Sequence, residues 1–70
     1  MKTINGCAII AHRPSTVWND NGLAILAVKT FPDGTYEYVT AIVRTLDDRE
    51  WNWGHYNTSL EAATSDYFSR

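Results

Sequence analysis

A chain of 70 residues can form one domain, residues 1–70, and such a domain buries only about 60% of its unfolded surface, so every large apolar side chain matters to its core. With 44% hydrophobic and 20% charged residues, the composition argues against intrinsic disorder. The net charge is −2, and the six basic residues are scattered without the clustered stripe that phosphate binding requires, which disfavours conventional nucleic-acid binding.

The start of the chain, MKTINGCAII, resembles neither a signal peptide nor a membrane span. It has one lysine, and Asn5 and Gly6 interrupt its apolar run early. No stretch of the chain approaches the roughly 20 apolar residues that cross a bilayer. A single cysteine, Cys7, can close no internal disulfide, and we expect it to be a buried, inert thiol. We therefore expect no membrane association and a reducing, cytoplasmic compartment.

Residues 3–12 are expected to form the first strand, because CAIIAH is a short apolar run. Arg13 and Pro14 are expected to end it, since proline cannot donate to a ladder of backbone hydrogen bonds. The segment 13–22 is rich in turn-forming residues and predicts a loop that contains Trp18. We expect the Trp18 indole to fold back over the sheet, because exposure would forgo a large gain from burial.

The clearest local signal is TFPDGTY, which predicts a hairpin between strands at 23–31 and 35–45. Pro32, Asp33 and Gly34 supply the chemistry of a type I turn closed by a glycine bulge. This turn fixes a register in which Lys29 faces Glu37 and Leu23 faces Val43. The run LAILAV at 23–28 is apolar on both faces, so the hairpin should be central in its sheet. Its second face must be covered by a loop, by the tryptophan-rich segment, by another copy of the chain or by a different protein.

After the polar corner LDDRE at 46–50, the stretch EWNWGHY predicts a possible further strand at 50–56. A period of two would place Trp51, Trp53 and His55 on one face of that strand.

A C-terminal helix is predicted at about 58–69. Thr58 and Glu61 have the spacing of a capping box, in which each side chain satisfies a free amide at the helix start. The apolar stripe of the helix consists of Leu60, Ala63, Tyr67 and Phe68. Together the elements predict a small α+β fold: an antiparallel sheet of three to four strands with one C-terminal helix packed on one face. The strand order is open, except that 23–31 and 35–45 should be neighbours.

The chain offers no recognisable catalytic or metal-binding motif. His12, His55 and Cys7 do not have the spacing of zinc ligands, and no nucleophile is paired with a base in the sequence. We therefore expect no enzymatic activity, no metal and no cofactor.

The aromatic stretch at 50–58 has two interpretations, which the spacing does not separate. Trp51 and Trp53 could fill the space between sheet and helix, or they could stack on bases and sugars or anchor a protein partner. We expect at least one indole to be core and the other to make a contact. The acidic corner at Asp47 and Asp48 is either a solvated rim or a patch that docks on a basic surface.

The leading interpretation is a non-enzymatic protein-binding module, in its plainest form a homodimer, because one helix is a narrow cover for a hairpin that is apolar on both faces. The expected contact residues are Trp18, Tyr36, Tyr38, Asp47, Asp48, Trp51, Trp53 and His55. The alternative is a binder of single-stranded nucleic acid or carbohydrate that uses exposed aromatic side chains. In its small size, acidity and lack of catalytic or metal motifs, the chain is similar to the stoichiometric inhibitors that phages and mobile elements use against host defence, anti-CRISPR proteins among them. That similarity implies an inhibitor that acts through its surface.

Overall fold

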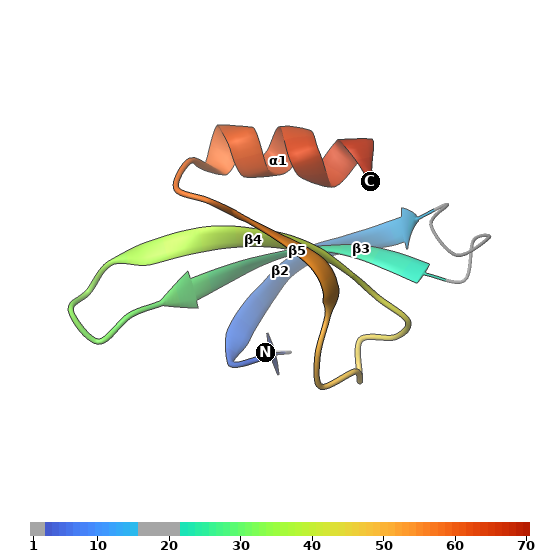
Figure 1. The fold of residues 1–70 in the computed structure, drawn as a ribbon, viewed down its shortest axis with the longest axis horizontal. Helices are drawn as coiled ribbons and strands as arrows, with labels where there is room; N and C mark the ends of the chain where they lie inside the picture. Colours follow the sequence, from blue (N-terminus) through green and yellow to red (C-terminus); the bar gives the residue numbers. More distant parts are fainter. Residues whose placement is uncertain (1–2, 16–21) are drawn as a thin grey trace.

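Figure 1 shows the computed structural model of the protein, which describes residues 3–15 and 22–70. Five antiparallel strands in the order β1-β2-β3-β4-β5 form a half-barrel sheet, and one C-terminal helix packs against it. The elements are β1 (Thr3–Ile4), β2 (Cys7–Ser15), β3 (Gly22–Thr30), β4 (Tyr36–Val43), β5 (Asn52–Asn57) and α1 (Leu60–Ser69). The expectation of three to four strands is therefore wrong, although the sheet is antiparallel and the helix lies on one of its faces.

The additional strand arises at Asn5 and Gly6, which divide the predicted first strand in two. Both residues have positive φ, at 53° and 74°, and Ile4 pairs with Cys7 across them. Asn-Gly is the sequence that a two-residue hairpin turn favours, because both central residues must adopt left-handed backbone conformations. The short β1 is the result of this local chemistry.

The second strand also runs further than expected, through Pro14 to Ser15. Pro14 pairs with Leu23 of β3, and among residues 3–15 and 22–70 the part of β2 beyond Ala8 has β3 as its one neighbouring strand. A proline is tolerated where a strand has no second neighbour to which its N–H would donate. Trp18 lies outside the described residues.

The central hairpin has the register that its turn predicts. All eight pairs of β3 and β4, from Leu23 with Val43 to Thr30 with Tyr36, follow it. Phe31 N donates to Thr35 O at 2.8 Å, and Gly34, at φ 91°, closes the turn with a bond from its own N–H to Phe31 O. The register is confirmed.

The helix begins one residue later than the capping box predicts. Ser59 is the N-cap, and its hydroxyl oxygen accepts a hydrogen bond from Ala62 N at 3.3 Å. On the sheet side α1 buries Ala63 and Tyr67, whereas Leu60 and Phe68 remain exposed. The apolar stripe that packs on the sheet is therefore narrower than the sequence pattern predicts.

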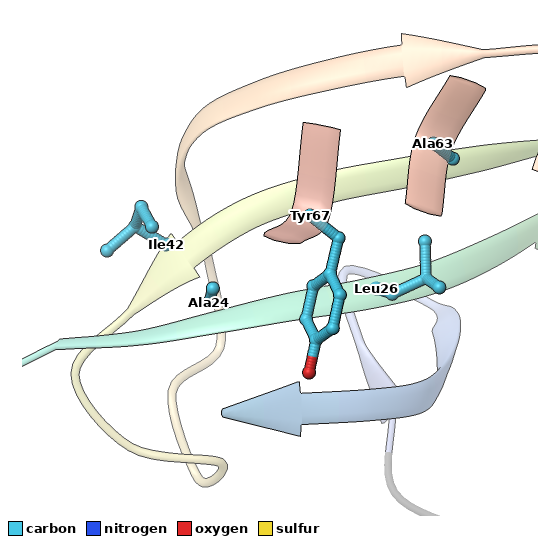
Figure 2. Packing of buried hydrophobic residues seen from close by; sticks show 5 residues of the cluster. All are labelled: Ala24, Leu26, Ile42, Ala63 and Tyr67. Atoms are coloured by element: carbon cyan, nitrogen blue, oxygen red, sulfur yellow. The ribbon is translucent and has the colours of Figure 1, made fainter. Parts of the chain in front are cut away.

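The core has two halves, one on each face of the sheet. On the helix side, Tyr67 points from α1 to the sheet beside Leu26, as Figure 2 shows. That cluster consists of Ala24, Leu26, Ile42, Ala63 and Tyr67, with Ala11 and Tyr38 packed at its margin. Figure 1 shows that the β3–β4 hairpin extends past the start of α1, so the helix covers only the inner part of this face.

The opposite face is closed by the chain itself. Ile4 from β1 and the half-buried side chains of Leu46 and Trp51 pack over the inner residues of β3 and β4. The buried members on this side are Ile4, Cys7, Ile25, Ala27, Val39, Ala41 and Val43. The tryptophan-rich segment and β1 therefore cover the face of the hairpin opposite α1, because the sheet curls over itself.

Candidate functional site

A β-bulge in the edge strand β5 separates the aromatic side chains that the sequence groups together. His55 pairs with Thr40 and Asn52 pairs with Ile42, so Ala41 alone opposes two residues, Trp53 and Gly54. One extra residue in a strand reverses the faces of everything beyond it. The prediction that Trp51, Trp53 and His55 share one face is therefore wrong: Trp51 packs into the core, and His55 contacts the helix.

Trp51 is the inward-facing tryptophan. It packs against both buried clusters on the side away from α1, and its ring meets Tyr56 edge to face with centroids 6.5 Å apart. Gly54 makes this packing possible, since a β-carbon there would lie 2.8 Å from the indole Nε1 of Trp51. One tryptophan thus packs against the core, but the expectation that the tryptophans fill the space between sheet and helix is wrong, because Trp51 is half-buried on the face away from α1 and Trp53 is exposed.

Trp53 is the outward-facing tryptophan. It is 56% exposed and has a φ of 52°, a conformation that is a genuine outlier for so bulky a residue. Its carbonyl oxygen accepts a hydrogen bond from Nη2 of Arg70, at the end of α1. Bulges commonly redirect a side chain, and here the redirected residue is a large aromatic on an edge strand.

A polar group, which we call the helix–edge cluster, joins this bulge to the helix. Its members are Thr40, His55, Asp66 and Arg70. The buried hydroxyl of Thr40 donates to Oδ2 of Asp66, and Nη1 of Arg70 donates to the same carboxylate at 3.4 Å. Burial raises the pKa of Asp66, but the bonds from Thr40 and His55 and the charge of Arg70 outweigh it, so this pKa is lower than that of an ordinary aspartate.

His55 completes the cluster with one ring nitrogen. Nδ1 lies 2.8 Å from Nη1 of Arg70 and 3.0 Å from Oδ2 of Asp66. Nδ1 can accept a hydrogen bond from Arg70, with the proton of the neutral ring on Nε2, or it can carry the proton and donate to Asp66. In both arrangements His55 links β5 to the C-terminal part of α1.

Two other expected contact residues, Tyr36 and Tyr38, lie at the start of β4, next to the β3–β4 turn. Tyr36 is exposed, Tyr38 is half-buried against the helix-side cluster, and their rings meet edge to face at 5.6 Å. Burial, with a smaller effect of Tyr36, raises the pKa of Tyr38. Only Tyr36 offers most of its ring to a partner.

The acidic corner lines a shallow depression of about 570 Å³ beside the β1–β2 turn. Asp47 is exposed, whereas Asp48 is half-buried and its Oδ2 accepts a hydrogen bond from Arg44 N at 2.8 Å. The depression is lined by Thr3, Ile4, Asn5, Gly6, Leu46, Asp47, Asp48 and Arg49. Asp48 thus helps to hold the loop between β4 and β5 in place.

Trp53 and His55 lie near each other on β5. Tyr36 and Tyr38 lie on β4, the acidic corner lies in the loop between β4 and β5, and Trp51 packs against the core. Sequence reasoning missed Thr40, Asp66 and Arg70 as partners of β5. The four-residue spacing of Asp66 and Arg70 was an available signal, because it places the two charges on one helical face.

Over residues 3–15 and 22–70, no three His, Cys, Asp or Glu side chains are grouped so that they could hold a metal ion. In the same part of the chain, no helix has both the length and the apolarity to cross a membrane. Comparison of the chain with protein-family models, with curated proteins and with solved structures finds no match.

Proposed function

We propose that the protein is a non-enzymatic protein-binding module whose contact surface is the β5 edge, with Trp53 as the anchor. The observation that carries the proposal is an indole that is more than half exposed and fixed at a bulge by a hydrogen bond from Arg70 to its own carbonyl. A small domain gains stability from each aromatic side chain that it buries. An exposed tryptophan in a strained backbone conformation costs stability, and a role in binding accounts for that cost. Tryptophan is also among the residues that dominate binding energy at protein interfaces.

In the described part of the chain, features that oppose the pairing of another strand lie on the edge strand β5 and on β2 beyond the short β1. The bulge in β5 lies at Trp53 and Gly54, and β2 has a bulge at Ile10 as well as Pro14. Bulges and proline disrupt the row of backbone groups that a further strand would use. The proposed contact therefore depends on side chains, and a homodimer, if it forms, would use the exposed aromatic surface rather than a continuous sheet.

The negative charge of the C-terminal half of the chain favours a partner whose contact surface is basic. Residues 36–70 carry six acidic side chains against three arginines, and Asp47 and Asp48 precede β5. Complementary charge accelerates encounter with such a partner. A cytoplasmic location, based on the single cysteine, and an inhibitory role toward host defence, based on the similarity in size and acidity, belong to the same proposal.

The test is capture of partners from a lysate of the source cell with the wild-type protein, with Trp53→Ala and with Phe68→Ala. Phe68 is a matched control, because it is 67% exposed but lies on the helix. We expect Trp53→Ala to weaken binding to the captured protein at least about tenfold, as loss of an interface anchor does, and Phe68→Ala to retain binding. Equal binding by wild type and Trp53→Ala would refute the proposal.

The second arm of the test addresses single-stranded nucleic acid. Trp53 and Tyr56 are both exposed on β5 and could stack on bases. A tryptophan-fluorescence titration with an oligonucleotide at low salt should give no response, because phosphate binding needs clustered basic side chains. A salt-sensitive response that Trp53→Ala abolishes would favour the nucleic-acid alternative over a protein partner.

A further inference from the structure

The turn between β1 and β2 is an Asn-Gly pair that is open to water. Asn5 and Gly6 are both exposed, and no atom beyond the adjacent residues lies within 4 Å of the position that a β-carbon on Gly6 would occupy. On its N-terminal side the turn is held by the two-residue strand β1, which pairs with β2 at Thr3 and Ile4. The backbone of the Asn-Gly pair can therefore rotate without displacing a side chain packed against Gly6.

An asparagine followed by glycine reacts with its own backbone in water. The backbone nitrogen of Gly6 attacks Cγ of Asn5 and loses its proton, the side-chain amide leaves as ammonia, and a five-membered succinimide ring forms. Water then opens the ring at either of its two carbonyl carbons, which gives aspartate or isoaspartate at position 5. The net reaction consumes one water molecule and releases one ammonia, without an oxidant or a reductant. Glycine favours the attack because it has no side chain to hinder the rotation that brings its nitrogen to Cγ.

We propose that Asn5 is a site of spontaneous deamidation, and that its isoaspartyl product releases β1 from the sheet. In isoaspartate the main chain runs through Cβ, so the turn gains one backbone atom. A two-residue hairpin turn depends on a specific left-handed geometry at both central residues, which Asn5 and Gly6 have, at φ 53° and 74°. The lengthened turn cannot keep this geometry, and the pairing of Ile4 with Cys7 is lost. This site lies away from the β5 edge and does not rest on the proposed function.

The release of β1 changes the surroundings of Cys7. The thiol is 1% exposed, and its Sγ donates to the backbone oxygen of Asn5 at 3.6 Å, so it contacts the turn itself. Burial raises the pKa of the Cys7 thiol, which keeps the reactive thiolate scarce. Ile4, 2% exposed, packs beside Ile25 in the neighbouring cluster. When β1 leaves, we expect both side chains to become accessible and the thiol to react with reagents in solution.

The experiment incubates the purified full chain at pH 8 for several days. Tandem mass spectrometry measures the conversion of amide to acid at each asparagine, and an isoaspartyl methyltransferase measures isoaspartate. The isoaspartyl fraction is then separated by ion exchange, and the rate at which its thiol reacts with an aromatic disulfide reagent is measured. We expect conversion at Asn5 and a rate for Cys7 at least about tenfold above that of the unmodified protein, because the thiol moves from a protected part of the chain to a frayed end. Asn52 and Asn57 precede bulky or β-branched residues and should remain unconverted.

Two variants separate the lengthened backbone from the new charge. Asn5→Gly has no side-chain amide and keeps a favoured hairpin turn, because Gly-Gly also adopts this geometry. After the same incubation its thiol should stay protected. Asn5→Asp places a carboxylate beside Asp47 and Asp48, which line the same depression as Asn5, but does not lengthen the chain. Freshly prepared, it should also keep Cys7 protected.

Three outcomes would overturn the proposal. The first is an Asn5 amide that survives the incubation, and the second is an isoaspartyl fraction in which Cys7 stays protected. The third is an accessible thiol in aged Asn5→Gly, which would assign the effect to another site, such as the second Asn-Gly pair at Asn21, a residue outside the described part of the chain. Because no partner is present, the result is independent of whether the partner-binding proposal holds.

Discussion

The indole of Trp51, the residue before β5, lies so close to the backbone of Gly54 within that strand that a β-carbon at Gly54 would lie 2.8 Å from the indole nitrogen. Gly54 is also one of the two bulge residues that oppose Ala41. The absence of a side chain there allows the strand to stay paired while the neighbouring aromatic fills the core.

Gly54→Ala should destabilise the fold by about 1–3 kcal/mol, because the new methyl group would force either the Trp51 ring or the bulge to shift, as overpacking does. Urea unfolding followed by tryptophan fluorescence measures the change. The control is a double-mutant cycle with Trp51→Phe, whose smaller ring leaves room for the methyl group. The two changes should be coupled by about 0.5–3 kcal/mol, and additive effects would show that the ring is not what the methyl group meets.

Ile42→Ala should cost about 2–5 kcal/mol, because Ile42 is fully buried in the cluster beneath α1 and its truncation leaves a cavity. Ile10→Ala removes the same atoms from a side chain that is 50% exposed at the β2 bulge, and it should cost no more than about 0.5 kcal/mol. Urea midpoints, with unchanged dependence on denaturant, give both values. Equal losses in the two variants would contradict the placement of the helix over β4.

Acid should destabilise the protein in part through Asp66. Its pKa is lowered in the folded state, because the hydrogen bonds from Thr40 and His55 and the charge of Arg70 outweigh the effect of burial. A carboxylate with a lowered pKa contributes stability above its unfolded-state pKa of about 3.9 and loses it as the pH falls through the folded-state value. The urea midpoint of the wild type should therefore fall between about pH 5 and pH 2, and this fall should be shallower in Asp66→Asn.

Asp33, whose pKa is lowered by its bonds from Thr35, should retain part of the acid dependence in that variant. Glu61→Gln is the control, since Glu61 is an exposed carboxylate in the first turn of the same helix. It should keep the wild-type slope. An acid slope in Asp66→Asn as steep as that of the wild type would show that the Asp66 carboxylate is not held by the helix–edge cluster.

The sequence predicted best where a few adjacent residues decide the conformation. Pro32, Asp33 and Gly34 determine the β3–β4 turn, and the register of the hairpin follows from that turn alone. The helix was also predictable, although two neighbouring cap residues, Thr58 and Ser59, left its start uncertain by one position. Asn5-Gly6 carried the signal for a hairpin turn, but the short β1 before it offers too little apolar pattern to be recognised as a strand.

The site was less predictable, because its geometry depends on contacts between distant residues. The hydrogen bond that holds the Trp53 carbonyl comes from Arg70, 17 residues away, and the Thr40 hydroxyl reaches Asp66 across 26 residues. The bulge that these contacts stabilise reverses the faces of β5, so a strict period of two misplaced His55.

The sequence by itself determined the central hairpin, the presence of the C-terminal helix and the buried position of Cys7, because turn chemistry, helix capping and apolar alternation act over a few residues. The tertiary structure decided that Trp51 packs against the core and that Trp53 is exposed. That choice depends on where the helix places Arg70 relative to β5 and on how far the sheet curls over Trp51, and neither quantity is encoded in any short segment.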